Sequence, residues 1–527
     1  MMKTKYLLLA GAMALTTSCS DDDLYLNPST SLSDETILET YESAYTVLMG
    51  AYAATEHYYY LTIGQISQEV MGNDIFITNG NYGFSTYYWL MYAYNYIQYA
   101  DVVDGWWSAY TEYMWRKAYT AIGNCNQLIY NVDELPSGCD DLVAQAYGIR
   151  GWNFLNLYHL YCAGYNNPTY GGDSGKGLFL RLTPASADES LMVERSALGV
   201  SMDQIISDLT YAYENVSSSN SNYYINPKAC ALLLARTYLE LSDYSNASKY
   251  AEIAAGSTFD GSNLMSQAEY QSGFMEANDE WLWGLQFDSE TTNIYASIPS
   301  FYHAATSMDS EAVFGTAEYG TLVPGSSVSE RYTYLTENAV DWMTGYSTVR
   351  VAFSFVDTFA KDDDGIFTDC RALFPFYLSE EDGYFTAKFN NNGSLGIADY
   401  PLARIAEAYL IEAEAQLQLG NTATALSVLN ALQTERNGTV STAVTVDEIY
   451  AERRRELYGE GFAIGDLKRL QMGVTRVGSE HWSDVLTLEA NSPRMMFPIP
   501  DDELLYNPYY KDSDEDYNKG QNDYWAK

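Results

Sequence analysis

Few residues of this chain are arranged for catalysis or metal binding. Its four histidines, His57, His159, His303 and His481, stand far apart, and none is paired at metal-ligand spacing. The sequence contains neither an HExxH zinc helix nor a GxSxG nucleophile turn. We therefore predict no catalytic residue, no metal and no cofactor. A glycosidase needs only two carboxylates at a suitable separation, and the 70 Asp and Glu residues leave that alternative open.

Aromatic side chains offer a different chemistry, the binding of sugars. The chain has 49 Tyr and 10 Trp residues, and many of them stand in irregular stretches rather than on helical faces. A sugar ring presents one apolar C–H face and a rim of hydroxyl groups, so it matches an exposed aromatic plane bordered by amide, carboxylate or guanidinium groups. Aromatic residues in loops with polar neighbours are therefore the candidates for ligand binding.

The charge of the chain restricts its partners. Residues 1–18 hold two lysines and no acids, so the remainder has 26 basic and 70 acidic side chains and a formal charge of −44. Nucleic acid needs a basic footprint, and the only basic cluster, Arg453 to Arg455, is flanked by Glu452 and Glu456. This excludes nucleic acid as a partner and favours a ligand that is neutral or cationic.

The N-terminus reads as an export signal. Lys3 and Lys5 precede an apolar run, and small residues lead to Cys19. We predict a lipoprotein signal peptide over 1–18, lipid on Cys19 and a lipid-anchored segment over 19–40. The alternative is an ordinary secretory signal whose cleavage leaves a cysteine. No later run reaches the ~20 apolar residues that a spanning helix needs.

The other five cysteines show no regular spacing. They stand at 125, 139, 162, 230 and 370 without a CxxC pair, so we expect buried thiols rather than a disulfide framework. A pair between Cys125 and Cys139 remains an alternative.

Helical periodicity predicts the scaffold that positions these residues. Apolar residues recur at helical spacing in two successive helices over 402–432, and a segment near 228–251 repeats the arrangement with an offset of 178 residues. The matched residues are Ala235 with Ala413, Leu241 with Leu419, and Ala247 with Ala425. Small residues at matching places are typical of tetratricopeptide-like helical pairs.

We therefore predict a mainly α fold in which tetratricopeptide-like helical hairpins form a scaffold with long irregular loop insertions. The expected elements are a helix over 41–58, helical pairs near 115–161, 200–251 and 402–432, and a loop-rich insertion over 284–400, all within one domain over 41–527. Long irregular insertions on a rigid scaffold usually carry function.

The C-terminal third carries the motifs of a known family. Residues 401–415, PLARIAEAYLIEAEA, resemble the PLxRxAExYLxxAEA helix of the SusD/RagB family of nutrient-binding lipoproteins. Further blocks follow in order: ERRREL at 452–457, GEG at 459–461 leading to DLKR at 466–469, and FPIP at 497–500 with Glu503 and Asn507-Pro508. The chain departs from the family pattern at Ile464-Gly465 and in its acidic, Tyr-rich tail. The resemblance covers nearly the whole chain after residue 18.

The resemblance implies a non-catalytic protein on the cell surface, lipid-anchored in the outer membrane. Such a protein binds an oligosaccharide or polysaccharide and delivers it to a SusC-like TonB-dependent barrel. Because the family includes RagB-like peptide binders, peptides or glycoprotein fragments remain an alternative ligand. The family blocks are then mostly structural, and we expect Arg404, Glu412, Arg454 and Glu456 to form charge pairs that hold the last helices together.

The resemblance also suggests where the ligand binds. Starch-binding members of the family carry a stacking Trp just before the first helical pair, where this chain has Trp106 and Trp107. We expect one of these rings to be buried and the other to face the ligand. The neighbouring candidates are Asn79, Asn81 and Tyr82 in the preceding Gly/Asn-rich loop, and Tyr295 and Tyr302 in the insertion after Trp283.

Overall fold

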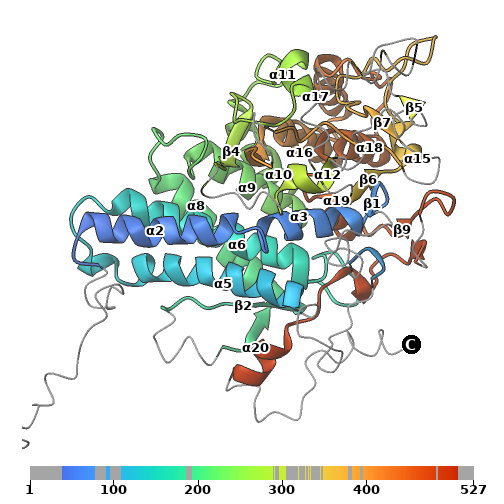
Figure 1. Ribbon diagram of the computed structural model, residues 1–527. Coiled ribbons are helices and arrows are strands. Elements are labelled where there is room, and N and C mark those ends of the chain that lie inside the picture. The colour runs from blue at the N-terminus through green and yellow to red at the C-terminus, as the bar shows by residue number, and fades with distance from the viewer. Residues whose placement is uncertain are drawn as a thin grey trace, which may run out of the picture.

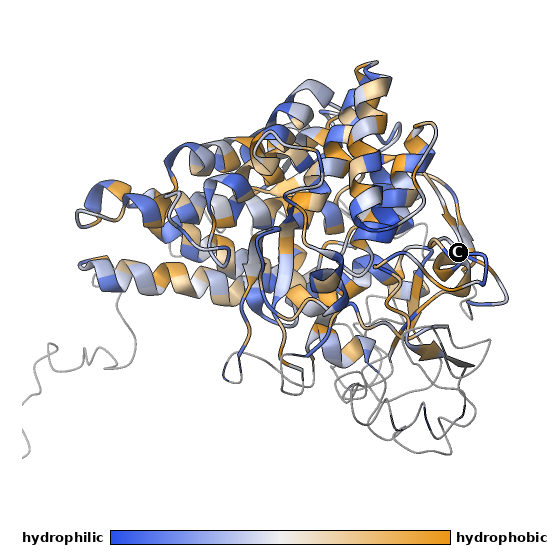
Figure 2. Cartoon of the chain, turned by 90° about the horizontal axis from the view of Figure 1, so that it is seen from above, coloured by the Kyte–Doolittle hydropathy of each residue, from blue (hydrophilic) through white to orange (hydrophobic). Residues whose placement is uncertain are grey.

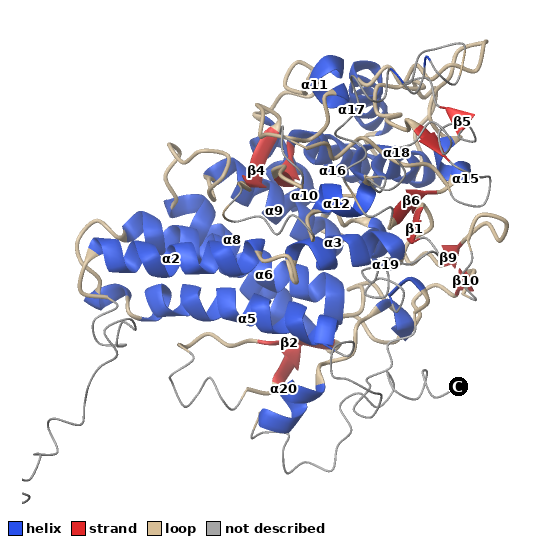
Figure 3. Ribbon diagram, viewed as in Figure 1, coloured by secondary structure: helices blue, strands red, loops and turns tan. Residues whose placement is uncertain are grey.

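The structure is a computed structural model of the chain, and helices dominate it (Figure 3). It describes residues 38–77, 91–94, 109–184, 193–288, 290, 296–303, 318–319, 327, 330, 333, 345, 348–377, 383–391, 396–481 and 485–507.

Four long helices from the first half of the chain pack together (Figure 1). They are α2 (Tyr41–Glu56), α5 (Ala109–Tyr130), α6 (Asp140–Tyr161) and α8 (Leu198–Asn215), and α2 contacts both α5 and α6. The shorter α3 (Leu61–Val70) follows α2 after a tight turn. Glycine allows α6 and α8 to approach closely, since a Cβ added at Gly151 would lie 2.9 Å from the side chain of Leu209.

The predicted internal repeat is present as two helical hairpins. The first consists of α9 (Pro227–Glu240) and α10 (Tyr244–Ala255), and the second of α16 (Ile405–Gln418) and α17 (Thr422–Glu435). Both helices of the second hairpin begin 178 residues after their counterparts, and α10 packs directly against α16. The matched alanines have no exposed surface: Ala235, Ala413, Ala247 and Ala425. The prediction of a mainly α, tetratricopeptide-like fold is confirmed.

The other elements are short. The remaining helices are α11 (Gln267–Gln271), α12 (Ile298–Tyr302), α15 (Phe353–Val356), α18 (Val446–Leu457), α19 (Ala463–Arg469) and α20 (Asp501–Tyr506), with 3-10 turns at Val132–Glu134 and Pro493–Met495. Within the described ranges the strands form five antiparallel pairs: β1 (Ile75–Ile77) with β6 (Val349–Val351), β2 (Lys176–Phe179) with β3 (Arg195–Ala197), β4 (Trp281–Leu285) with β8 (Tyr400–Arg404), β5 (Glu318–Tyr319) with β7 (Phe376–Tyr377), and β9 (Val474–Thr475) with β10 (Thr487–Leu488).

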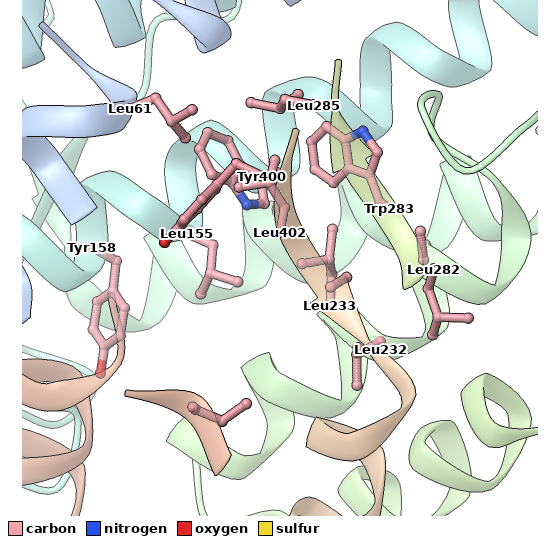
Figure 4. Close-up of a cluster of buried hydrophobic side chains, with 14 of the residues drawn as sticks. Leu61, Leu155, Tyr158, Leu232, Leu233, Leu282, Trp283, Leu285, Tyr400 and Leu402 are labelled. Carbon is pink, nitrogen blue, oxygen red and sulfur yellow. The ribbon is translucent and has the colours of Figure 1, made fainter. Parts of the chain in front are cut away.

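The β4–β8 pair lies in the middle of the core. Figure 4 shows Trp283 and Leu285 of β4 near Tyr400 of β8, with Leu61 of α3 in the same cluster. The Trp283 ring also meets Trp152 of α6 edge to face, at a centroid distance of 5.7 Å. Burial of each such side chain stabilises the fold by about 1.5–3 kcal/mol. The core therefore fixes the start of α3 against β8.

A buried ion network joins the C-terminal helices. Glu456 of α18 pairs with Arg404 at 3.0 Å, with Arg436 at 3.1 Å and with Arg371 at 3.2 Å, and none of these side chains is more than 1% exposed. Burial alone would raise the pKa of Glu456, but the three guanidinium groups outweigh burial and hold that pKa well below its usual range. The network therefore neutralises charges that would otherwise be buried unpaired.

The predicted charge pairs are confirmed in part. Arg404 and Glu456 pair with each other, whereas Arg454 pairs with Asp74 near β1 and so ties α18 to the N-terminal half. The prediction is wrong for Glu412, which accepts a hydrogen bond from the Gln416 amide at 2.7 Å. The helix turns this carboxyl towards polar uncharged groups rather than an arginine, and burial raises its pKa.

The five cysteines that the structure describes are buried and unpaired, as predicted. Burial raises the pKa of Cys125 to about 12, so its thiol stays protonated and unreactive. Hydrophobic and hydrophilic residues are mixed along most helices (Figure 2), whereas α3 and most of α6 and α16 are buried on all sides. None of the helices in the described ranges has the length and apolar character needed to cross a membrane.

Candidate functional site

Most of the predicted functional residues lie outside the described residues. These are Cys19, Asn79, Asn81, Tyr82, Trp106, Trp107 and Tyr295. Tyr302 is described and lies in α12, where it has no exposed surface and its ring packs 5.2 Å from that of Phe389. A fully buried ring offers no face to a sugar, so Tyr302 is a core residue in this structure and we remove it from the candidate ligand contacts.

A cavity of about 400 Å³ lies between the end of α2, the start of α3 and the chain that connects β4 with α12. We call it the α2–α3 cavity. Its described lining consists of Ala53, Glu56, His57, Tyr58, Thr62, Phe287, Glu290, Ala296, Ser297, Ile298, Ala398 and Tyr400. Small-molecule sites commonly have volumes of about 300–1,000 Å³ and combine apolar walls with a few polar groups, as this cavity does.

Four half-buried rings extend from the cavity. His57 and Tyr58 stack with centroids 4.9 Å apart, Tyr58 lies 4.1 Å from Tyr59, and Tyr59 stacks on Tyr113 of α5 at 4.6 Å. We call these four residues the aromatic cluster. The Arg116 guanidinium lies 5.7 Å from the Tyr113 ring centre. Aromatic faces beside a guanidinium and carboxylates are suited to the apolar face and hydroxyl rim of a sugar.

The turn between α2 and α3 produces this cluster. α2 ends at Glu56 because His57 adopts an extended conformation, with φ −58° and ψ 130°. The backbone N–H groups of Tyr60 and Leu61 donate to the His57 carbonyl at 2.8 and 2.9 Å, which closes the turn. Tyr60 points into the core and is fully buried, whereas Tyr58 and its neighbour Tyr59 keep part of their surface exposed.

Two predicted ligand segments connect to this region through described residues. Ala296 directly follows Tyr295 and lines the α2–α3 cavity. α5, which contributes Tyr113 to the aromatic cluster, begins two residues after Trp107. One end of each segment is thus joined to the cavity lining or to the helix that carries Tyr113. The third segment, 79–82, follows β1 instead.

Glu56 and His57 determine the electrostatics of the cavity. Burial, together with the carboxylates of Asp288 and Asp399, raises the pKa of Glu56 to about 7. Burial and the nearby Lys117 lower the pKa of His57 to about 4, so its imidazole is uncharged at neutral pH. The Nδ1 atom of His57 accepts a hydrogen bond from the Tyr59 backbone N–H at 3.3 Å, so its Nε2–H is the group that can donate to a sugar hydroxyl, and the Glu56 carboxyl can accept from one. Among the residues described, no cluster of His, Cys, Asp and Glu could hold a metal ion.

A second cavity, of about 690 Å³, lies between α5 and α20. The Trp115 indole N–H donates to Glu503 at 3.1 Å, and Arg181 pairs with the same carboxylate at 2.8 Å. Glu503 belongs to the last family block of the sequence. Its contacts hold α20 against α5, which gives that block a structural role.

Sequence reasoning missed Glu56, His57, Tyr58 and Tyr59 because it assigned 41–58 to one helix. The available signal was the run of His57 and three tyrosines at the end of that helix. Four consecutive large rings cannot all face a core, so such a run indicates a turn that exposes some of them.

Two family profiles match the chain. One, described as "SusD family", matches residues 377–527, and another, described as "Starch-binding associating with outer membrane", matches residues 65–239. Among curated proteins, SusD-like protein P38 of Formosa agariphila is 23% identical over 412 residues, which cover 70% of this chain and 74% of the relative.

Several solved structures share the fold. A SusD superfamily protein from Bacteroides thetaiotaomicron aligns with a TM-score of 0.69 at 22% identity, over 89% of this chain and 98% of its own. A SusD-like carbohydrate binding protein from Bacteroides vulgatus gives 0.68 at 22% identity, over 90% and 98%. Surface glycan-binding protein A from Bacteroides uniformis gives 0.63 at 17% identity, over 89% and 98%.

Proposed function

Because the chain belongs to the SusD/RagB family, we propose that it binds an oligosaccharide or polysaccharide at the cell surface and delivers it to a SusC-like TonB-dependent transporter, without catalysis. The observation that carries this proposal is the aromatic cluster beside the α2–α3 cavity. A saccharide ligand is supported by the matching family described as starch-binding and by two similar structures, one of a carbohydrate binding protein and one of a glycan-binding protein. Lipid on Cys19 would hold the protein at the outer membrane.

In this proposal the sugar stacks on exposed aromatic faces, and its hydroxyl groups meet the polar lining. Tyr58 supplies the aromatic ring that lines the cavity, while Glu56, His57 and Ser297 supply hydrogen-bonding groups. The predicted contacts from the undescribed segments complete the site, and they are Asn79, Asn81, Tyr82, Trp106, Trp107 and Tyr295.

An array of neutral, acidic and amino oligosaccharides and of peptides, followed by affinity measurements, tests the proposal. Loss of an aromatic contact typically costs about 2 kcal/mol or more, and about 1.4 kcal/mol is a decade of affinity. Tyr58→Ala and one of Trp106→Ala and Trp107→Ala should therefore bind at least roughly tenfold more weakly. Tyr130→Ala is the matched control, because Tyr130 is 60% exposed at the opposite end of α5 from Tyr113.

The array also separates the alternatives. Retention of peptides alone would favour the RagB-like alternative. Release of shorter sugars, abolished by Glu56→Gln, would indicate a glycosidase, because a carboxyl with a pKa near 7 suits a general acid. Unchanged affinity in all three folded ring variants would contradict the proposed site.

A further inference from the structure

The α2–α3 cavity has an unusual charge composition. Its described lining contains the carboxylates of Glu56 and Glu290 but no lysine or arginine. Asp288 and Asp399 add further negative charge close to Glu56. The one titratable nitrogen base in the lining, His57, is uncharged at neutral pH. No described group of the lining can therefore form an ion pair with an acidic sugar. Lys117, which acts on His57, and Arg116, which lies beside Tyr113, belong to α5 and are not part of the described lining.

The sequence extends this observation to the chain segments around the cavity. The stretch 6–115 contains no lysine or arginine, and neither does 251–330. The first stretch provides α2, α3 and the start of α5, and the second provides β4, α12 and the chain between them.

Glu56 is the residue most affected by the absence of lysine and arginine from the described lining of the cavity. It is the last residue of α2, and the last turn of that helix has no basic residue. The C-terminal end of a helix carries partial negative charge, so the ionised carboxyl is disfavoured by the helix as well as by burial and by Asp288 and Asp399. A positive group of a ligand would stabilise the ionised Glu56 carboxyl, and a second anion would destabilise it further.

We propose that the α2–α3 cavity selects saccharides by charge, accepting uncharged sugars, favouring sugars with a protonated amino group and rejecting acidic sugars, with Glu56 as the residue that determines this preference. The inference rests on the proposed function, since it assumes that a saccharide occupies the cavity. Like-charge contacts in a binding site suppress wrong partners, so an acidic sugar should bind at least roughly tenfold more weakly than its neutral counterpart.

The test uses sugar pairs that share a backbone and differ in charge. Oligogalacturonate is compared with its methyl ester, and N-trimethyl chitosan hexamer, whose positive charge does not depend on pH, with chitin hexamer, at neutral pH and low salt on the full chain. If the array retains a different neutral glycan, that glycan is compared with its C6-oxidised form, which carries carboxylates on the same backbone. Glu56→Gln is measured beside Glu214→Gln, a control whose side chain is exposed on α8.

The expected result is weaker binding of the acidic member of each pair and a smaller difference in Glu56→Gln, with Glu214→Gln like the wild type. The preference for N-trimethyl chitosan over chitin should also fall in Glu56→Gln. Equal affinity of the wild type for the acidic and neutral members would overturn charge selection while leaving saccharide binding intact. If the affinity difference between the acidic and the neutral member were as large in Glu56→Gln as in the wild type, the role of Glu56 would be overturned. Failure to retain any saccharide would instead contradict the proposed function.

Discussion

Replacing Glu456 by Gln tests the buried ion network at its centre. The substitution keeps the size of the side chain but removes the charge that faces the guanidinium groups of Arg371, Arg404 and Arg436. Breaking a buried ion pair by removing one charge costs about 3–5 kcal/mol, because the partner is left uncompensated. Glu280 still pairs with both Arg404 and Arg436, so we expect a loss at the lower end, about 3 kcal/mol.

Thermal and urea unfolding at neutral pH, followed by circular dichroism, measure this loss. An unfolding entropy of about 2.1 cal/mol/K per residue gives about 1 kcal/mol/K for roughly 500 residues, so Tm should fall by about 3 °C. Glu214→Gln is the control, because an exposed substitution should change the free energy of unfolding by less than about 0.5 kcal/mol. If Glu456→Gln matched this control, the reasoning about uncompensated buried charge would be refuted.

The same variant has a predicted pH dependence. The pKa of Glu456 lies below its unfolded value of 4.5. The carboxylate therefore contributes stability above about pH 4.5, and this contribution is lost as the pH falls through the folded pKa. The stability difference between the wild type and Glu456→Gln should consequently shrink at pH values below 4.5. A difference that stays constant on acidification would contradict the assigned direction of the shift.

Three further predictions concern the core, a buried histidine and the anchor. Gly459→Ala should cost roughly 2 kcal/mol of unfolding free energy, because Gly459 has φ +80° and an added Cβ would lie 2.4 Å from the Phe389 ring, whereas Gly123→Ala on α5, with open space around it, should stabilise the protein by up to about 1 kcal/mol. Urea titration of both variants checks this, and equal effects would count against it. Burial, aided by Arg476, lowers the pKa of His481 from 6.5 to about 3, so its contribution to stability is fully present above pH 6.5 and is lost as the pH falls towards 3. His481→Asn should flatten the stability profile in that interval by up to about 1.4 kcal/mol per pH unit, and an unchanged profile would disprove the assignment. Cys19→Ala should release the protein from the membrane fraction, and native levels of membrane-bound Cys19→Ala would exclude the lipid anchor.

The helical scaffold was predictable from the sequence because each helix carries its own local signal. The 178-residue offset found from matched alanines recurs as the offset between the first residues of α9 and α16. Caps sharpen the boundaries: Asn226 accepts from the Ala229 N–H at the start of α9, and Thr40 forms a capping box with Ser43 at the start of α2. Periodicity and capping depend on residues that lie close together in the chain, so a single sequence is enough to predict where these helices lie and where they begin.

The binding region was predictable only in part because its walls come from distant segments. The cavity joins Glu56 at the end of α2 with Phe287 after β4 and Ala398 before β8. No local periodicity relates these residues, and the separation of Arg454 from its partner Asp74 by 380 residues shows the same problem for ion pairs. Tyr302 illustrates the opposite error, because a tyrosine in a loop-rich insertion resembles a ligand contact until a short helix buries it.

The distribution of cations links the stability of the scaffold to the charge of the binding region. At least eleven of the 28 lysine and arginine side chains are buried, together with at least 14 of the 70 acidic ones. Buried lysine and arginine normally require partners, and the network around Glu456 shows how they obtain them. The interior is therefore close to charge balance and holds a disproportionate share of the cations. The acidic residues outside the interior therefore outnumber the cations there. Because many cations are used in the ion pairs that stabilise the C-terminal helices, the α2–α3 cavity has none in its described lining, and we propose that Glu56 determines its charge preference.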